Sequence, residues 1–356
     1  MESLEDLSRD VTEHVAKHLN PVDLIELAFV SSAWDRLIKS FRIHIREVYL
    51  SLRGLAYGDE KGVADILLGV RLVQRGFVHF FFYKKTVEEL REIQNDPRTS
   101  IKYFDGIPME CQVDQSNVKI YTVDPIESFI SVMNHVILLF NGPIHHVQLA
   151  NCCPKTDVVI TPLLRRPKFL ECTKMTIPNG QRISNHLLRL FLGLPNLQNF
   201  HCFAGPISQF TFIKPINIRY FSTCFGEWIN RRTLYSLNSE SIDLVDPRLS
   251  LQDLNAYIKK WLEEEESKIF KRLYIIFCRG WKFEDDEIKG DEKIFEGIEW
   301  KKYDEKTSKR PRYYVDKVKG KFDMKNARDI QRSDGTLATV RTESDSFLFV
   351  VWKYSE

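Results

Sequence analysis

Neighbouring histidines are the first candidates for metal chemistry in this sequence. His14 and His18 are four residues apart in a helical stretch, a spacing that places two imidazoles on one face of a helix, where they can bind zinc. No glutamate follows the first histidine and no third ligand is evident. His145 and His146 are adjacent in an expected strand, so their side chains point to opposite faces. We therefore predict that His14 and His18 face solvent and that neither pair forms a metal site.

The seven cysteines give no sign of a metal site or a nucleophile. Cys152 and Cys153 are adjacent, which is not metal-ligand spacing, and no C-x-x-C pair occurs. The pattern is typical of reduced thiols in a cytosolic or nuclear protein. The sequence has no P-loop, G-x-S-x-G or G-x-G-x-x-G string. We predict no catalytic residue and no cofactor, and we expect a protein that is not an enzyme.

Composition and charge point to an ordinary globular chain. Of the 356 residues 43% are hydrophobic and 28% are charged, and the net charge is +2 from 51 basic and 49 acidic residues. This balance supplies no general attraction to nucleic acid or to an anionic membrane. No apolar run is long enough to span a bilayer, and the acidic first residues lack the pattern of a secretory signal. We expect neither a nucleic-acid nor a membrane partner.

A basic stretch over residues 301–312 is the one candidate for a nucleic-acid patch. It contains Lys309 and Arg310 beside Tyr303, but Asp304 and Glu305 interrupt it. A nucleic-acid patch needs its basic groups gathered on one face. We therefore do not predict a nucleic-acid patch in this stretch.

Residues 7–41 predict three short helices. Val11, Val15 and Leu19 recur every four residues, and Asn20-Pro21 ends one helix and starts the next, because Asn caps well and Pro suits a first turn. Ser32 and Asp35 have capping-box spacing before a third helix. Helices below ~12 residues depend on tertiary packing. We expect part of their apolar surface to face a partner helix; the alternative is a small helical cap on the next domain.

This segment resembles the F-box. The matching string is Leu7-Ser8, Val11, Val15, Leu19-Asn20-Pro21-Val22-Asp23-Leu24, Leu27, Val30-Ser31 and Trp34, followed by Leu37-Ile38, with Ser8 at a position that is proline in most of the family. The resemblance implies docking onto the Skp linker, and through it the cullin, of an SCF-type ubiquitin ligase. It implies that the Skp-binding residues are Leu7, Val11, Val15, Pro21, Leu24, Val30, Trp34 and Leu37.

A loose repeat follows a mixed α/β stretch. Ile144-x-x-Val147-x-Leu149-x-x-Cys152 fits the frame of a leucine-rich repeat. The same spacing recurs in Leu170-x-x-Thr173-x-Met175, Leu197-x-x-Phe200-x-Cys202 and Phe270-x-x-Leu273-x-Ile275, and more faintly in Ile242-x-Leu244. Helices are expected between these strands, at 157–166, 183–192 and 251–262. The pattern predicts a curved α/β solenoid; an ordinary α/β domain whose strands share this spacing is the alternative.

The tail predicts an antiparallel meander. Strands are expected at 313–317, 329–332, 336–341 and 347–352, and Asp334-Gly335 is a tight-turn signal. The stretch Leu237 to Ile275 looks like the F-box-associated domain of nematode F-box proteins, as do Asp329 to Val340 and, more weakly, Ser100 to Phe140. In that family this domain is thought to select substrates.

The expected fold is therefore α+β or α/β. Its predicted parts are an F-box at 1–46, a mixed α/β connecting region at 47–125, an irregular leucine-rich-repeat-like domain at 126–300, and its closing β-meander at 301–356. The expected function is that of a cytoplasmic or nuclear adaptor that joins an unidentified target protein to the Skp linker. A repeat-type interaction scaffold independent of ubiquitination is the alternative.

Overall fold

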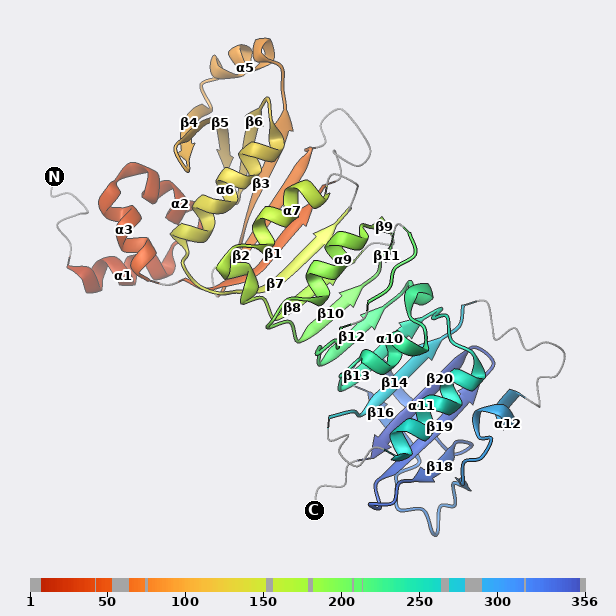
Figure 1. Ribbon diagram of the computed structural model, residues 1–356. Helices are drawn as coiled ribbons and strands as arrows, with labels where there is room; N and C mark the ends of the chain where they lie inside the picture. The colour runs from red at the N-terminus through yellow and green to blue at the C-terminus, as the bar shows by residue number, and fades with distance from the viewer. Residues whose placement is uncertain are drawn as a thin grey trace. The chain divides into compact units, whose positions relative to one another are not determined.

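The computed structural model describes residues 8–41, 43–52, 64–73, 76–151, 156–178, 182–206, 208–212, 214–263, 269–278, 290–316 and 318–352. The chain divides into two compact units, Met1–Leu197 and Gln198–Glu356. Both are mixed α/β structures, which confirms the predicted class (Figure 1). The boundary between the units falls inside the segment 126–300 that the sequence treats as one domain.

Unit 1 begins with the three predicted helices, followed by a mixed sheet. The helices are α1 (Arg9–His18), α2 (Pro21–Val30), α3 (Ser32–Ser40), α5 (Val87–Gln94), α6 (Pro125–Leu139), α7 (Thr156–Leu164), α8 (Pro167–Leu170) and α9 (Asn185–Leu192). The strands are β1 (Ile45–Ser51), β2 (Ile66–Leu72), β3 (Gly76–Lys84), β4 (Thr99–Phe104), β5 (Ile107–Asp114), β6 (Asn117–Thr122), β7 (Ile144–Ala150), β8 (Lys174–Ile177) and β9 (Arg182–Ile183).

Local signals explain where the helices of unit 1 start. Asn20 accepts a hydrogen bond from the Asp23 amide, as predicted for the cap of α2. The third helix differs by one residue, because Ser31 rather than Ser32 is its cap and accepts from the Ala33 amide at 3.1 Å. The helix α6 ends before Gly142, where a side chain is impossible because its Cβ would lie 2.6 Å from the Ile43 carbonyl oxygen.

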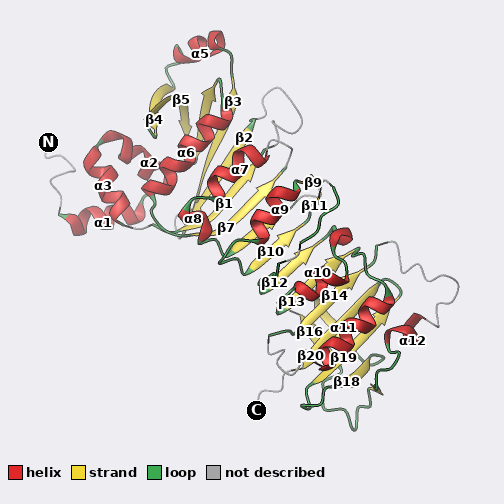
Figure 2. Cartoon of the chain, viewed as in Figure 1, coloured by secondary structure: helices red, strands yellow, loops and turns green. Residues whose placement is uncertain are grey.

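The main sheet of unit 1 runs in the order β8-β7-β1-β2-β3-β6-β5-β4. Strand β1 pairs parallel with β7 and antiparallel with β2, and β3 pairs parallel with β6. Figure 2 shows α6 and α7 along one face of these strands. Phe80 and Phe82 of β3 and Phe129 of α6 are fully buried between them. The core therefore lies between the sheet and its helices.

Unit 2 combines four parallel strands with an antiparallel part. Its helices are η2 (Gly226–Trp228), α10 (Arg231–Ser236), α11 (Leu251–Glu263) and α12 (Gly290–Ile294). Its strands are β10 (Asn199–Cys202), β11 (Gly205–Pro206), β12 (Tyr220–Thr223), β13 (Ser241–Val245), β14 (Arg272–Ile276), β15 (Lys301–Lys302), β16 (Tyr313–Asp316), β17 (Gly320–Asp323), β18 (Arg328–Gln331), β19 (Leu337–Glu343) and β20 (Ser346–Trp352).

The strand order in unit 2 is β10-β12-β13-β14-β20-β19-β18-β15. The first four strands are parallel, and β20 joins β14 antiparallel and continues into the predicted meander with β19 and β18. The strand expected at 313–317 is not part of this meander. It forms β16, which pairs with β17 in a separate hairpin. This hairpin packs through its inward side chains on the face of the sheet, and it adds no strand to the sheet edge.

Most apolar positions of the repeat frame are buried, but Leu170 ends α8 and is 37% exposed. Val147 and Met175 are buried in unit 1, and Phe200, Ile242 and Leu273 are buried in unit 2. Cys152 lies outside the described residues. Strand β12 was not predicted from the sequence. It lies between β10 and β13, and its Phe221 is buried beside Phe200 and Ile242.

Candidate functional site

The three N-terminal helices carry the residues predicted to bind the Skp linker, and the structure places these residues in three environments. Val11 is 46% exposed and Val30 is 78% exposed. Val15 and Leu37 are half-buried. The remaining described members, Pro21, Leu24 and Trp34, are buried, and Leu7 lies outside the described residues. The chain thus covers some of these side chains itself and leaves two valines in solvent.

Ser8 stands where the F-box pattern has proline. It is the residue before α1, and its side chain makes no capping hydrogen bond. Its carbonyl oxygen accepts from the Thr12 amide at 3.0 Å and from the Thr12 hydroxyl at 2.6 Å. The first turn of α1 is therefore held through the backbone at Ser8, a role that does not need the proline ring.

Aromatic contacts fix these helices to the rest of unit 1. Phe29 of α2 stacks on the His135 ring of α6 with 5.2 Å between centroids, and it meets Phe104 of β4 edge-on at 5.0 Å. Glu26 of α2 forms an ion pair with Lys102 of β4. The apolar side of α2 therefore has a partner inside the chain, whereas the side chain of Val30, next to Phe29, stays in solvent.

His135 makes this attachment sensitive to acid. Burial lowers the pKa of His135, partly opposed by Asp35 and Asp105 and reinforced by Lys39. Its Nε2 atom is buried without a hydrogen-bond partner among the described residues. The neutral imidazole is thus favoured in the folded chain, while the unfolded chain takes up a proton near the ordinary value of about 6.5. The contribution of neutral His135 to the free energy of unfolding is therefore fully present above about pH 6.5, and it is lost as the pH falls toward the lowered pKa.

We expect wild-type protein to lose more thermal stability between pH 7.5 and 5.5 than His135→Leu, which cannot titrate. Circular dichroism melting curves at the two pH values measure the difference. His14→Leu, which removes an exposed histidine, is the matched control and should behave as wild type. An equal loss in wild type and His135→Leu would contradict this assignment.

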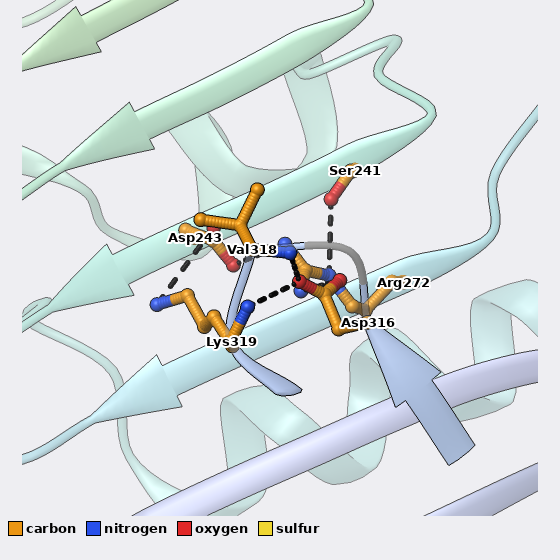
Figure 3. Close-up of polar contacts among 6 residues, drawn as sticks. All are labelled: Ser241, Asp243, Arg272, Asp316, Val318 and Lys319. Carbon is orange, nitrogen blue, oxygen red and sulfur yellow. Dashed lines mark hydrogen bonds and ion pairs between the residues drawn. The ribbon is translucent and has the colours of Figure 1, made fainter. Parts of the chain in front are cut away.

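A polar cluster around Arg272 lies on the face of the unit 2 sheet that carries the β16–β17 hairpin (Figure 3). Arg272 donates from Nε to the Ser241 hydroxyl at 3.0 Å, from Nη2 to Asp243 at 2.7 Å, and from Nη1 to Asp316. Burial raises the pKa of Asp243, and the charges of Arg272 and Lys319 oppose this rise. The buried guanidinium therefore compensates two carboxylates that come from β13 and β16.

The same cluster holds the β16–β17 hairpin against the sheet. Asp316 accepts from the amides of Val318 at 2.9 Å and Lys319 at 2.8 Å, which shapes the tip of the hairpin. Under the hairpin, Phe322 packs on Tyr274 of β14 with 5.6 Å between centroids. Because α11 packs on the other face through Trp261 and Phe349, the hairpin and the helix lie on opposite faces of the sheet.

Arg310 is a second buried cation, and nothing in the sequence indicated its burial. Its side chain is completely buried and donates from Nε to Asp329 at 2.6 Å and from Nη2 to the Met324 carbonyl at 2.9 Å. Its guanidinium also lies 4.4 Å from the centre of the Tyr303 ring. In the sequence Arg310 stands out only as one cation of the basic stretch 301–312, and in the structure it is buried because Asp329 supplies a counter-charge.

Metal and thiol chemistry find no support in the described ranges. The His14 and His18 rings meet edge-on at 4.8 Å, and no set of three or more histidine, cysteine, aspartate or glutamate side chains there is placed to hold a metal ion. His146 lies 3.6 Å from Glu47 and hydrogen-bonds the Thr176 hydroxyl. Cys152 and Cys153 lie outside the described residues.

The buried cysteines of the described ranges are poor nucleophiles. Burial raises the pKa of Cys111 and of Cys202 to about 12 and that of Cys172 to about 11. These thiols are therefore protonated at neutral pH and inert. Within the described ranges, no helix combines the length and apolar character needed to cross a bilayer.

Comparison with known proteins assigns two parts of the chain. Residues 4–46 match the F-box domain, and residues 208–275 match a domain described as F-box associated. An uncharacterized protein of Caenorhabditis elegans is 20% identical over 367 residues, covering 98% of this chain and 79% of that protein. No solved structure matches the chain.

The two domain matches fall on elements already described. The first contains α1, α2 and α3, and the second contains β12, β13 and β14 together with Arg272 and Asp243. The predicted likeness of Leu237 to Ile275 is confirmed, while that of Asp329 to Val340 and of Ser100 to Phe140 lies outside the matched residues and stays a prediction. The chain therefore carries an F-box domain at its N-terminus and an F-box-associated domain toward its C-terminus.

Proposed function

We propose that this chain is a substrate-recognition adaptor of an SCF-type ubiquitin ligase. Its F-box docks the Skp linker, and through that linker the cullin, while the F-box-associated region binds an unidentified target protein. Neither nucleic acid nor membrane is a partner, and the adaptor works in the cytoplasm, the nucleus or both.

The exposure of Val11 and Val30 is the observation that supports this proposal most. Helix α2 already has internal partners in α6 and β4, and yet Val30 remains 78% exposed, while Val11 on α1 is 46% exposed. Apolar side chains left on helices beside a well-packed core are suited to a partner helix. Val15 and Leu37, which are half-buried, extend this surface.

The buried members of the predicted Skp set act in a second way. Pro21, Leu24 and Trp34 fix the path of α2 and the packing of α2 on α3, so that the exposed valines are presented in one geometry. Leu7 belongs to the proposed contact on the resemblance alone. Interface energy concentrates in a few anchors, and we assign that role to Val11 and Val30.

The target-binding part comprises two elements in this proposal. Strands β10 and β12–β14 with α10 and α11 are the unit 2 part of an irregular leucine-rich-repeat-like array, and the antiparallel strands β18–β20 close it. We retain the divisions 1–46, 47–125, 126–300 and 301–356 for the F-box, the connecting region, the array and its closing meander. The array needs no reacting group, because holding a target near a ubiquitin-carrying enzyme raises the local concentration of its lysines.

Co-purification tests the proposal against a scaffold without ligase function. Tagged full-length chain should retrieve the Skp linker and cullin from cells, and a chain in which Val11 and Val30 are both aspartate should lose them while keeping its target proteins. A scaffold would retrieve its partners without cullin in either form, and that result would remove the ligase from the proposal. Deletion of residues 1–45 is a poorer variant, because it uncovers Phe104 and His135.

A further inference from the structure

Strand β4 ends the unit 1 sheet with exposed apolar side chains. It is the last strand in the order β3-β6-β5-β4. Ile101 is 54% exposed and Tyr103 is 60% exposed. Proteins commonly protect such an edge with a free lysine, a proline or a bulge, because its unpaired amides and carbonyls pair readily with another chain. The β4–β5 register runs without a bulge from Thr99 to Phe104.

The turn after β4 decides which backbone groups face outward. Asp105 and Gly106 have φ angles of 51° and 80°, as in the two-residue type I′ turn of a tight hairpin. The flanking residues Phe104 and Ile107 are therefore a hydrogen-bonded pair, and bonding alternates along the strand. By this alternation the amides and carbonyls of Ile101 and Tyr103 point away from β5.

The start of the strand agrees with this assignment. Thr99 has the same parity as Ile101, and its amide donates to the Asp96 carbonyl at 2.9 Å rather than to β5. The outward groups at Ile101 and Tyr103 thus continue a row that begins at Thr99.

The inward-bonded residues of β4 hold the strand in place beside the F-box helices. Lys102 forms its ion pair with Glu26 of α2, and Phe104 packs against Phe29. The ammonium group of Lys102 is therefore paired with Glu26 and does not protect the edge against pairing, and the Lys102 side chain is only 14% exposed. A rigid edge loses little conformational entropy when a peptide adds to it.

The charge around this edge is acidic. Residues 85–114, which are all described, carry seven acidic and four basic side chains. Three of the four cations are already paired, Lys85 with Glu89, Arg98 with Asp96 and Lys102 with Glu26. Exposed Glu88 and Glu92 of α5 add to the negative field. Such a field favours a cationic partner.

We propose that β4 binds an extended, lysine- or arginine-rich segment of a partner protein by β-strand addition. The outward backbone groups of Ile101 and Tyr103 supply the hydrogen bonds, and their exposed side chains pack on alternate residues of the segment. The acidic surroundings select a basic sequence. This site lies on unit 1 and is independent of the proposed docking of the Skp linker.

A labelled ten-residue peptide of alternating lysine and valine is the probe, and fluorescence anisotropy with the full-length chain measures its binding. Ile101→Pro removes one outward amide without breaking a bond to β5, and it should weaken binding about tenfold. Ile101→Thr keeps the amide and β propensity and is the matched control, with a much smaller loss. A peptide of alternating glutamate and valine should bind at least tenfold more weakly than the lysine peptide.

A second variant keeps the test valid if Ile101→Pro perturbs the hairpin. Glu88→Lys with Glu92→Lys changes exposed side chains alone and should weaken the lysine peptide while strengthening the glutamate peptide. Equal binding of the two peptides by wild type, or binding unaffected by Ile101→Pro in folded protein, would overturn the proposal. A concentration-dependent dimer that Ile101→Pro abolishes would also overturn it, because a second copy would then occupy the edge.

Discussion

Replacing Arg310 by methionine is expected to lower the local free energy of unfolding around β18 and β19 by about 3–5 kcal/mol, the cost typical of breaking a buried ion pair by removing one partner. The substitution leaves the Asp329 carboxylate buried without its counter-charge. It also removes the donor to the Met324 carbonyl. Native-state hydrogen exchange of the β18 and β19 amides measures the change.

Two variants make this test specific. Arg312→Met removes a cation from an exposed pair with Asp323 and should leave the exchange of β18 and β19 unchanged, because exposed pairs contribute little. Arg310→Met combined with Asp329→Asn removes the stranded charge and should recover part of the loss. If the β18 and β19 amides of Arg310→Met exchange at wild-type rates, the Arg310–Asp329 pair does not stabilise these strands.

The same network gives a physical meaning to the segment from Asp329 to Val340. Asp329 also accepts from the Thr339 hydroxyl at 2.7 Å, and the indole of Trp352 donates to that hydroxyl at 2.7 Å. Hydrogen bonds donated by Arg332 lower the pKa of Asp334, which also caps the turn by accepting from the Thr336 amide. These residues hold the meander together, so we expect the predicted likeness of this segment to an F-box-associated signature to reflect the fold rather than contact with a target.

Replacing Val11 and Val30 together by aspartate is expected to weaken binding of the Skp linker at least about 30-fold while leaving the fold intact. Both side chains are exposed, so the carboxylates stay solvated in the free chain. In the complex they would be buried without a partner, at a cost typical of interface hot spots. Isothermal titration of purified linker into each protein measures the affinity.

Val158→Asp is the matched control for this experiment. Val158 lies on α7 of the same unit and is 62% exposed, between Val11 and Val30 in exposure. It should bind the linker as wild type does. If the control and the double variant lose affinity equally, surface charge and not the helical face would explain the effect.

Local signals in the sequence predicted the N-terminal helices well. Caps and apolar spacing act within a few residues, so α1 and α2 follow from Asn20-Pro21 and from the valine stripe. The cap of α3 was displaced by one residue, since Ser31 and Ser32 are equally good candidates until the backbone is known. The buried face of each repeat strand was likewise visible in its alternating residues, as at Phe200 and Cys202.

Long-range pairing could not be predicted in the same way. Strand β1 lies between β7 and β2 because of contacts across about a hundred residues, which no local periodicity encodes. The burial of Arg310 depends on Asp329, and that of Arg272 depends on Asp243 and Asp316, so each looks like a surface cation in sequence. The division of the Skp set into exposed and buried members also depends on packing between elements, which no local pattern encodes.

The most direct test of the adaptor account is hydrogen exchange of the full-length chain with and without purified Skp linker. If the F-box docks the linker, α1 and the Val30 end of α2 gain protection, with little change in β18–β20. Binding of the linker without added protection in α1–α3, or no binding at all, would contradict it.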